Sequence, residues 1–232
     1  MKHLLSEEFL NTYRNMKSPL SHIGEFVYLR TYSRYLEEKK RRETWFETVL
    51  RTTEYNIDLG IKHKKKMGLS INMDDEVREA EQLFDKLFNL RTFTSGRTLY
   101  MGGTEVVEKY PLSNYNCAFT NIEKFSDLVD VFYLLMVGSG VGIRITKELV
   151  EKLPKVRPVS LEGRYDGTVR ANTSKEDMED TRCIIDKNDS SIALILVGDS
   201  KEGWCDALEN FFKLLSLDEY KDVTRIIIDY SY

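Results

Sequence analysis

The chain has 232 residues, of which 41% are hydrophobic and 31% are charged, a composition typical of a folded globular protein rather than a disordered one. Its formal net charge of −4 gives no electrostatic reason to expect a nucleic-acid partner, and no apolar run approaches the ~18 residues that cross a bilayer. Three widely spaced cysteines argue against a disulfide framework and for the reducing cytoplasm. Three histidines without a close Cys/His pair argue against a structural zinc site.

Residues 1–90 have the pattern of a helical region. Ser6 is a typical helix start, because a serine hydroxyl can accept from free backbone N–H groups in the first turn. Apolar residues at helical spacing predict further helices, within 26–36, 45–52 and 77–88, with candidate caps for the last at Asn72 to Asp75. Charged runs indicate solvated turns, with phosphate or nucleic-acid contact as the weaker alternative for their basic parts, at 37–43 and 62–66.

Glycines become frequent after Arg91, and short apolar runs typical of strands appear. The runs lie at Cys117–Phe119, Gly142–Ile145, Ile192–Val197 and Arg225–Asp229. Helical patterns lie between them, at 125–136 and 201–215. This alternation predicts an α/β arrangement with strands buried on both faces. Residues 155–190, rich in charge, Gly, Thr and Asn, are expected to form an insertion or a mobile loop rather than core.

Cys117 is the first candidate for chemistry. A cysteine in a buried strand is most often a small hydrophobe; the competing interpretation is a redox thiol that ends in a disulfide. Asn116 beside it offers donor and acceptor atoms to a hydroxyl-bearing substrate. Polar Ser113 and Asn114 before it suggest a strand that enters from a mouth facing solvent or ligand.

Two glycine-containing segments are further candidates. The segment Gly138–Gly142 (GSGVG) follows a helix, so it differs from the dinucleotide fingerprint, and it is either a tight turn or a place where a ligand approaches the backbone. Thr94–Thr98 (TSGRT) with Met101–Thr104 (MGGT) could hydrogen-bond phosphate or sugar oxygens, or could be a capped loop. No lysine follows as in a Walker loop, which argues against an independent NTPase.

Features near the C-terminal helix have simpler interpretations. Asp199 or Ser200 is the expected N-cap, and Trp204 is expected to pack. Cys183 and Cys205 lie in no setting that stabilises a thiolate, so both are interpreted as structural or incidental.

Several motifs, in this order, resemble the N-terminal part of adenosylcobalamin-dependent (class II) ribonucleoside-triphosphate reductases. They are the helical segments Glu25–Arg34 and Arg42–Trp45, then SGRTL and MGGT at 95–104, NCAF at 116–119, GSGVG at 138–142 and DSKEGW at 199–204. The resemblance implies an α/β fold with a helical region at 1–90. The first strands and helices of a ten-stranded α/β barrel would follow at 91–232, and the barrel would be incomplete in this chain.

The resemblance also implies an activity. Ribonucleoside triphosphates would lose the ribose 2′-hydroxyl through a thiyl radical generated by cobalamin Co–C homolysis. Cys117 would be one of two substrate-reducing cysteines, and a thioredoxin-like protein would re-reduce them. Adenosylcobalamin would be held mostly by residues outside this chain, and a deoxynucleotide effector is expected. The substrate-binding residues implied are Ser95, Arg97, Thr98, Asn116, Gly138, Ser139 and Gly140.

The chain departs from the family in what it lacks. The radical-bearing cysteine, its nearby glutamate and asparagine, the second reducing cysteine and a C-terminal cysteine pair have no counterpart here. Because residues 226–232 are expected to end at a strand edge in mid-barrel, a long unpaired edge is predicted. We therefore expect one half of a split reductase, or a fragment, that needs a C-terminal reductase polypeptide carrying the rest of the barrel. The alternatives are a catalytically inactive nucleotide-binding or regulatory module of the same family, and a remnant without function.

Overall fold

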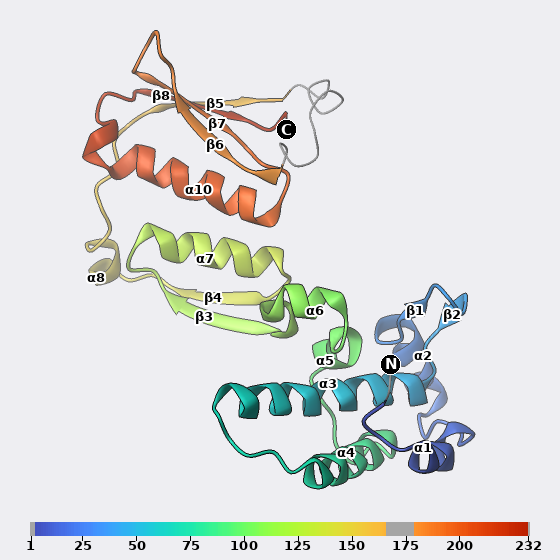
Figure 1. Ribbon diagram of the computed structural model, residues 1–232. Helices are drawn as coiled ribbons and strands as arrows, with labels where there is room; N and C mark the ends of the chain where they lie inside the picture. The colour runs from blue at the N-terminus through green and yellow to red at the C-terminus, as the bar shows by residue number, and fades with distance from the viewer. Residues whose placement is uncertain (1–2, 166–178, 232) are drawn as a thin grey trace. The chain divides into compact units, whose positions relative to one another are not determined.

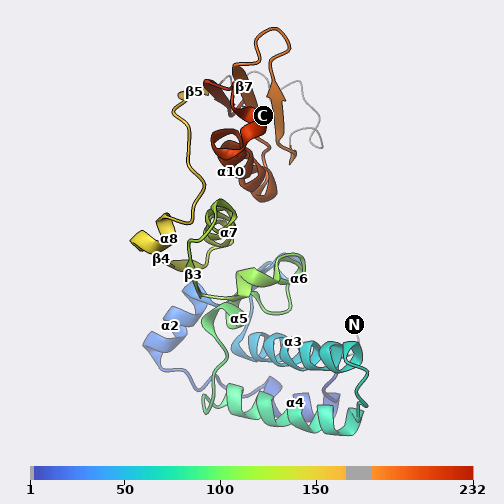
Figure 2. The same cartoon turned by 90° about the vertical axis from the view of Figure 1, so that its left-hand side faces the viewer.

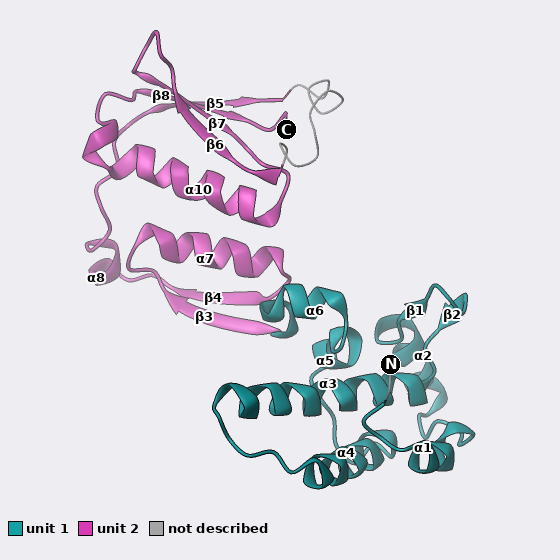
Figure 3. Cartoon of the chain, viewed as in Figure 1, with its two compact units in different colours: residues 1–115 teal, residues 116–232 magenta. Residues whose placement is uncertain are grey.

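The computed structural model describes residues 3–165 and 179–231 and divides the chain into two compact units (Figure 3). Unit 1 comprises residues 1–115 and unit 2 residues 116–232. The domain boundary that the composition placed near residue 91 stays a prediction.

Unit 1 is built from helices (Figure 1). They are α1 (Glu7–Arg14), α2 (His22–Thr31), α3 (Trp45–Lys66), α4 (Met73–Phe88), α5 (Gly96–Met101) and α6 (Glu105–Lys109), followed by the 3₁₀ turn η1 (Pro111–Asn114). The predicted caps are confirmed: the Ser6 hydroxyl accepts from the Phe9 N–H, and Asn72 caps α4. At α3, Thr44 and Glu47 form a capping box that satisfies two orphan N–H groups reciprocally.

The core of unit 1 lies between α3 and α4. The predicted apolar stripe of α4 supplies the buried Ala80, Phe84, Leu87 and Phe88, while Val77 and Leu83 are only partly buried. The Trp45 ring fills the same core and donates its indole N–H to the Phe88 carbonyl oxygen at 3.0 Å.

Two expectations for unit 1 were wrong. Helical spacing does not continue to Leu36, because α2 ends at Thr31 and a short antiparallel pair follows, β1 (Tyr35–Leu36) with β2 (Arg41–Arg42). Buried Ser33 redirects the chain there, since its hydroxyl donates to the Glu43 carbonyl oxygen at 2.8 Å. The basic run 62–66 is the last turn of α3 rather than a loop, where cations are favoured by the helix dipole.

Unit 2 is an α/β unit arranged in layers. A four-stranded sheet of order β5-β8-β7-β6 is followed by α10 (Lys201–Ser216), then α7 (Phe125–Met136), then a two-stranded ribbon of β3 and β4 (Figure 1). Figure 2 shows α10 lying between the sheet and α7 from a second direction. The strands are β3 (Cys117–Asn121), β4 (Gly140–Arg144), β5 (Ser160–Arg164), β6 (Arg182–Ile185), β7 (Ile192–Leu196) and β8 (Arg225–Asp229). The short α8 (Lys147–Val150) follows β4, and the 3₁₀ turn η3 (Asp218–Tyr220) precedes β8.

The strand pairing corrects three predictions. The segment 155–190 is not wholly an insertion, since β5 and β6 belong to the sheet; residues 166–178 lie outside the described part. The edge strand expected at 226–232 is not at the edge, because β8 lies between β5 and β7 and pairs in parallel with both. Burial on both faces fails for β3, where Cys117 and Phe119 are exposed because α7 covers only one face of the ribbon.

We predict that Phe84→Ala destabilises unit 1 by about 3–5 kcal/mol, the usual cost of removing a large ring from a packed core. The Phe84 ring is fully buried and contacts the rings of Phe9, Tyr13 and Phe46. Urea unfolding of the chain measures the loss. Phe93→Ala is the matched control, since Phe93 is 58% exposed; an equal loss in both variants would contradict this description of the core.

Candidate functional site

Parallel pairing of β3 with β4 brings Cys117 to the glycine turn. Cys117 is in register with Gly140, and the Gly140 N–H donates to the Asn116 carbonyl oxygen at 2.9 Å. Parallel strands need a crossover, and α7 provides it. Of the residues predicted for the site, Asn116, Cys117, Gly138, Ser139 and Gly140 therefore lie together at the start of the two strands.

The turn between α7 and β4 has the geometry that its glycines allow. Gly138 has φ +87°, in the left-handed region that side chains disfavour. The next residue, Ser139, is buried, and its N–H donates to the Leu134 carbonyl oxygen at 2.9 Å. The interpretation as a tight turn is confirmed, and the role in substrate binding stays a prediction.

One face of the ribbon points away from α7, and we call it the outer face. Alternation along the strands places on it Cys117, Phe119 and Asn121 from β3, each opposite a β4 residue of the same face, Gly140, Gly142 and Arg144. The sequence does hold a signal for this face, since residues two apart on a strand share a side. Sequence reasoning nevertheless missed Phe119, and it considered Gly142 only as the end of the glycine segment.

The segment 95–98 contacts the turn that precedes Asn116 in the chain. Ser95 caps α5 by accepting from the Thr98 N–H at 3.1 Å. Thr98 is buried, and its hydroxyl donates to Asn114 Oδ1 at 3.3 Å, while Arg97 donates to the Ser113 carbonyl oxygen at 3.3 Å. Arg97 and Thr98 thus hold η1. The predicted contact of all three residues with nucleotide stays a prediction.

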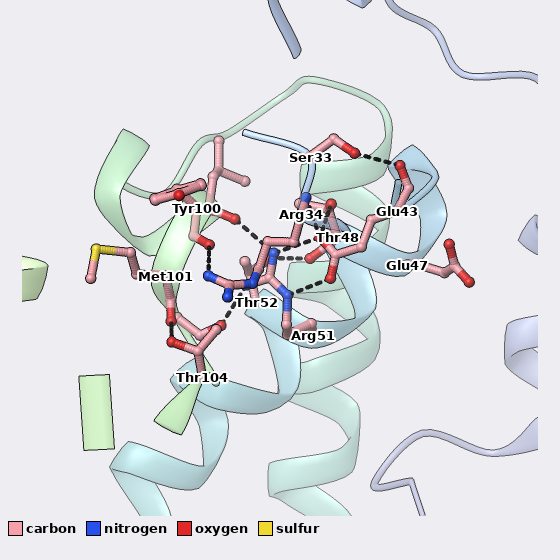
Figure 4. Close-up of polar contacts among 12 residues, drawn as sticks. Ser33, Arg34, Glu43, Glu47, Thr48, Arg51, Thr52, Tyr100, Met101 and Thr104 are labelled. Atoms are coloured by element: carbon pink, nitrogen blue, oxygen red, sulfur yellow. Dashed lines mark hydrogen bonds and ion pairs between the residues drawn. The ribbon is translucent and has the colours of Figure 1, made fainter. Parts of the chain in front are cut away.

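An ion pair between buried Glu43 and partly buried Arg51 fixes the MGGT segment (Figure 4). Arg51 on α3 donates from Nε to Glu43 Oε1 at 2.7 Å and from Nη2 to Glu43 Oε2 at 2.8 Å. The same guanidinium donates to the carbonyl oxygens of Leu99 and Gly102. A Cβ at Gly102 would stand 2.7 Å from the Thr98 carbonyl oxygen, so the backbone there approaches too closely for a side chain. Sequence reasoning missed this pair, because eight residues separate its members and no local spacing rule couples them.

Gly102 of MGGT therefore has a structural role, because its backbone packs closely against Thr98 and its carbonyl oxygen accepts from Arg51. Thr48 also donates to Glu43 Oε2, at 2.8 Å, and the Glu43 side chain is only 4% exposed. The whole network lies within unit 1 and joins β2, α3 and α5.

The C-terminal features agree with their simple interpretations. Ser200 caps α10 by accepting from the Gly203 N–H at 2.8 Å, and Trp204 stacks on Tyr230 with ring centroids 5.7 Å apart. Burial, followed by the nearby Asp206 carboxylate, raises the pKa of the Cys205 thiol to about 11. Cys117 and Cys183 are exposed. Within residues 3–165 and 179–231, no His, Cys, Asp and Glu cluster could hold a metal ion, and no helix is long and apolar enough to cross a membrane.

We predict that Arg51→Ala destabilises unit 1 by about 3–5 kcal/mol, because removal of one partner leaves a buried carboxylate unpaired. Arg41→Ala is the control: Arg41 pairs with Glu47 at the surface, with a side chain that is 45% exposed, and such pairs contribute about 0–1 kcal/mol. Equilibrium unfolding in urea compares the two. A loss in Arg51→Ala no larger than in the control would show that the buried pair does not hold the unit together.

Comparison with known proteins identifies relatives for this chain. Residues 5–104 match the family model of the ribonucleotide reductase alpha domain. The adenosylcobalamin-dependent ribonucleoside-triphosphate reductase of Lactobacillus helveticus is 29% identical over 90% of this chain and 32% of its own length. A probable enzyme of the same name from Dictyostelium discoideum is 32% identical over 60% of this chain and 19% of its own length. The chain thus spans about a third or less of the curated relatives that it matches.

A solved structure extends the likeness to the fold. The crystal structure of a B12-dependent (class II) ribonucleotide reductase matches 99% of this chain and 35% of its own chain, with a TM-score of 0.80 and 26% identity. This match confirms the predicted fold class, a helical region followed by the first strands and helices of a ribonucleotide reductase-type α/β barrel. By family match, sequence and fold together, the chain resembles the N-terminal part of the adenosylcobalamin-dependent, class II ribonucleotide reductases.

Proposed function

We propose that this chain supplies the part of a ribonucleoside-triphosphate reductase that carries Cys117 as a substrate-reducing thiol. The observation that carries the proposal is the pairing of β3 with β4, which puts an exposed thiol beside bare Gly140. A cysteine that served only as a small hydrophobe would be buried. The relatives named above, with their reductase names, supply the reaction class.

The proposed reaction balances with two thiols. The C2′–O bond of the ribonucleotide breaks, and the hydroxyl leaves as water. Two cysteines give up two electrons and two protons and join in a disulfide, so the products are a 2′-deoxyribonucleotide, water and an oxidised thiol pair. A thiyl radical on a third cysteine would remove the 3′-hydrogen and return it. A dithiol protein of the thioredoxin kind would reduce the disulfide.

The second thiol has to come from elsewhere. Cys205 is buried with a raised pKa, which disfavours the thiolate needed for thiol–disulfide exchange. Cys183 lies on β6 in the four-stranded sheet, separated from the ribbon by α10 and α7. We therefore assign the second reducing cysteine and the radical cysteine to a further reductase polypeptide, which would carry the rest of the barrel. The free thiols favour the cytoplasm as the compartment.

The remaining predicted site residues have roles that fit their chemistry. The Asn116 side chain offers donors and an acceptor to ribose hydroxyls. Gly138, Ser139 and Gly140 present backbone that a substrate can approach closely. Ser95, Arg97 and Thr98 would act on the nucleotide either directly or through η1, which Arg97 and Thr98 hold.

The described residues do not form a site that fits the corrinoid of adenosylcobalamin. The large hollow of unit 1, about 1010 Å³, is open and lined by charged side chains that are already bound to one another, such as Glu43 with Arg51 and Glu47 with Lys39 and Arg41. Adenosylcobalamin is expected for the complete enzyme, mostly on residues outside this chain.

The proposal predicts that the chain used as bait in its native extract captures a polypeptide with the missing reductase cysteines. Together with adenosylcobalamin and a dithiol, the pair should convert ribonucleoside triphosphates to deoxyribonucleotides. In this reconstituted reaction Cys117→Ser should abolish multiple turnover, whereas Cys183→Ser, the matched exposed thiol, should leave it unchanged. Full turnover in Cys117→Ser would contradict the assigned role. Nucleotide binding without reduction by any combination would instead favour the inactive regulatory module.

A further inference from the structure

The outer face of the ribbon carries the aromatic ring of Phe119, which has no role in the proposed reaction. The Phe119 side chain is 68% exposed, although it is large and apolar. It lies against the bare backbone of β4: a Cβ at Gly142 would stand 3.1 Å from ring atom Cδ2. That distance is shorter than an ordinary van der Waals contact. A side chain at position 142 would therefore push the Phe119 ring from its place, and glycine avoids this.

The space beside Cys117 on the same face is open. Among the residues that the structure describes, a Cβ at Gly140 would meet only the Asn116 carbonyl oxygen within 4 Å, at 3.6 Å. Residues two apart on a strand point to the same face and are separated by about 6.6 Å along the strand. The thiol and the ring therefore flank an open stretch of backbone. Arg144 continues the face one pair beyond Gly142 and gives an anionic ligand a complementary charge.

We infer that the ring of Phe119 is the apolar wall of the substrate site, against which the CH face of the ribose of a ribonucleoside triphosphate packs beside Cys117. Small-molecule sites are lined mainly by apolar and aromatic groups, with a few polar groups that fix orientation. Phe119 supplies the apolar wall, and Asn116 and Cys117 supply the polar and reactive groups. Gly142 acts on the substrate only through the ring, as a positioning residue. The inference rests on the proposed function, since it takes the substrate from there.

The test follows alkylation of Cys117 by iodoacetamide in the full chain bound to the captured reductase polypeptide. The chain carries Cys183→Ser, which removes its other exposed thiol. Increasing ATP or CTP should slow the alkylation. Phe119→Ala should raise the nucleotide concentration for half-protection by about tenfold, which corresponds to about 1.4 kcal/mol of ring contact. Phe119→Tyr, which keeps the ring, should restore protection to within about twofold of the parent chain.

Controls separate the ring from general effects. Leu161→Ala removes another exposed apolar side chain of unit 2, 57% exposed, and should leave protection unchanged. Gly142→Ala keeps the ring but displaces it, and should weaken protection by less than Phe119→Ala does. Circular dichroism verifies that each variant is folded.

The outcomes that overturn the inference differ from those that overturn the proposed function. Equal half-protection in Phe119→Ala and the parent chain overturns the inference and leaves a nucleotide site at Cys117. Equal protection by inorganic triphosphate also overturns it, because the nucleoside would then contribute nothing. Absence of any protection, with the captured reductase polypeptide present, overturns both.

Discussion

The ion pair between Glu43 and Arg51 is the interaction on which the helical unit depends. Its carboxylate accepts hydrogen bonds from Arg51 and Thr48, and its guanidinium reaches the carbonyl oxygens of Leu99 and Gly102. The pair thereby joins the end of β2 to α3 and to the segment after α5. Burial makes the arrangement all-or-none, because a single member left without the other would keep an uncompensated charge inside the protein.

The consequences of this pair continue along unit 1 as far as η1. With Gly102 held by Arg51, α5 is fixed, and Thr98 and Arg97 on α5 hold η1 by its Asn114 side chain and Ser113 carbonyl. Unit 1 ends one residue after η1, at Tyr115, and Asn116 and Cys117 begin unit 2. From there the second constraint is parallel strand pairing, since β3 finds its register on β4 only after α7 has returned the chain. The outer face is the result: a thiol, an aromatic ring and two glycines in fixed order.

Local signals in the sequence predicted most elements, and non-local contacts account for the failures. The caps Ser6, Asn72 and Ser200 were predictable because capping depends on a few adjacent residues. The burial of β3 was not, since it depends on whether a layer covers the second face of the ribbon. The interior position of β8 depends on a pairing with β5, about sixty residues earlier, that no local pattern encodes. For the site, the sequence indicated Asn116, Cys117 and the glycine turn, but it offered no sign that Thr98 would be buried against Asn114.

The central claim is that Cys117 changes redox state during reduction of a nucleotide. The most direct measurement is mass spectrometry of the Cys117 peptide after one turnover of the reconstituted enzyme without an external dithiol. The account predicts that Cys117 is recovered in a disulfide with a cysteine of the partner polypeptide, in an amount equal to the deoxyribonucleotide formed. Product formed while Cys117 remains a free thiol would contradict it.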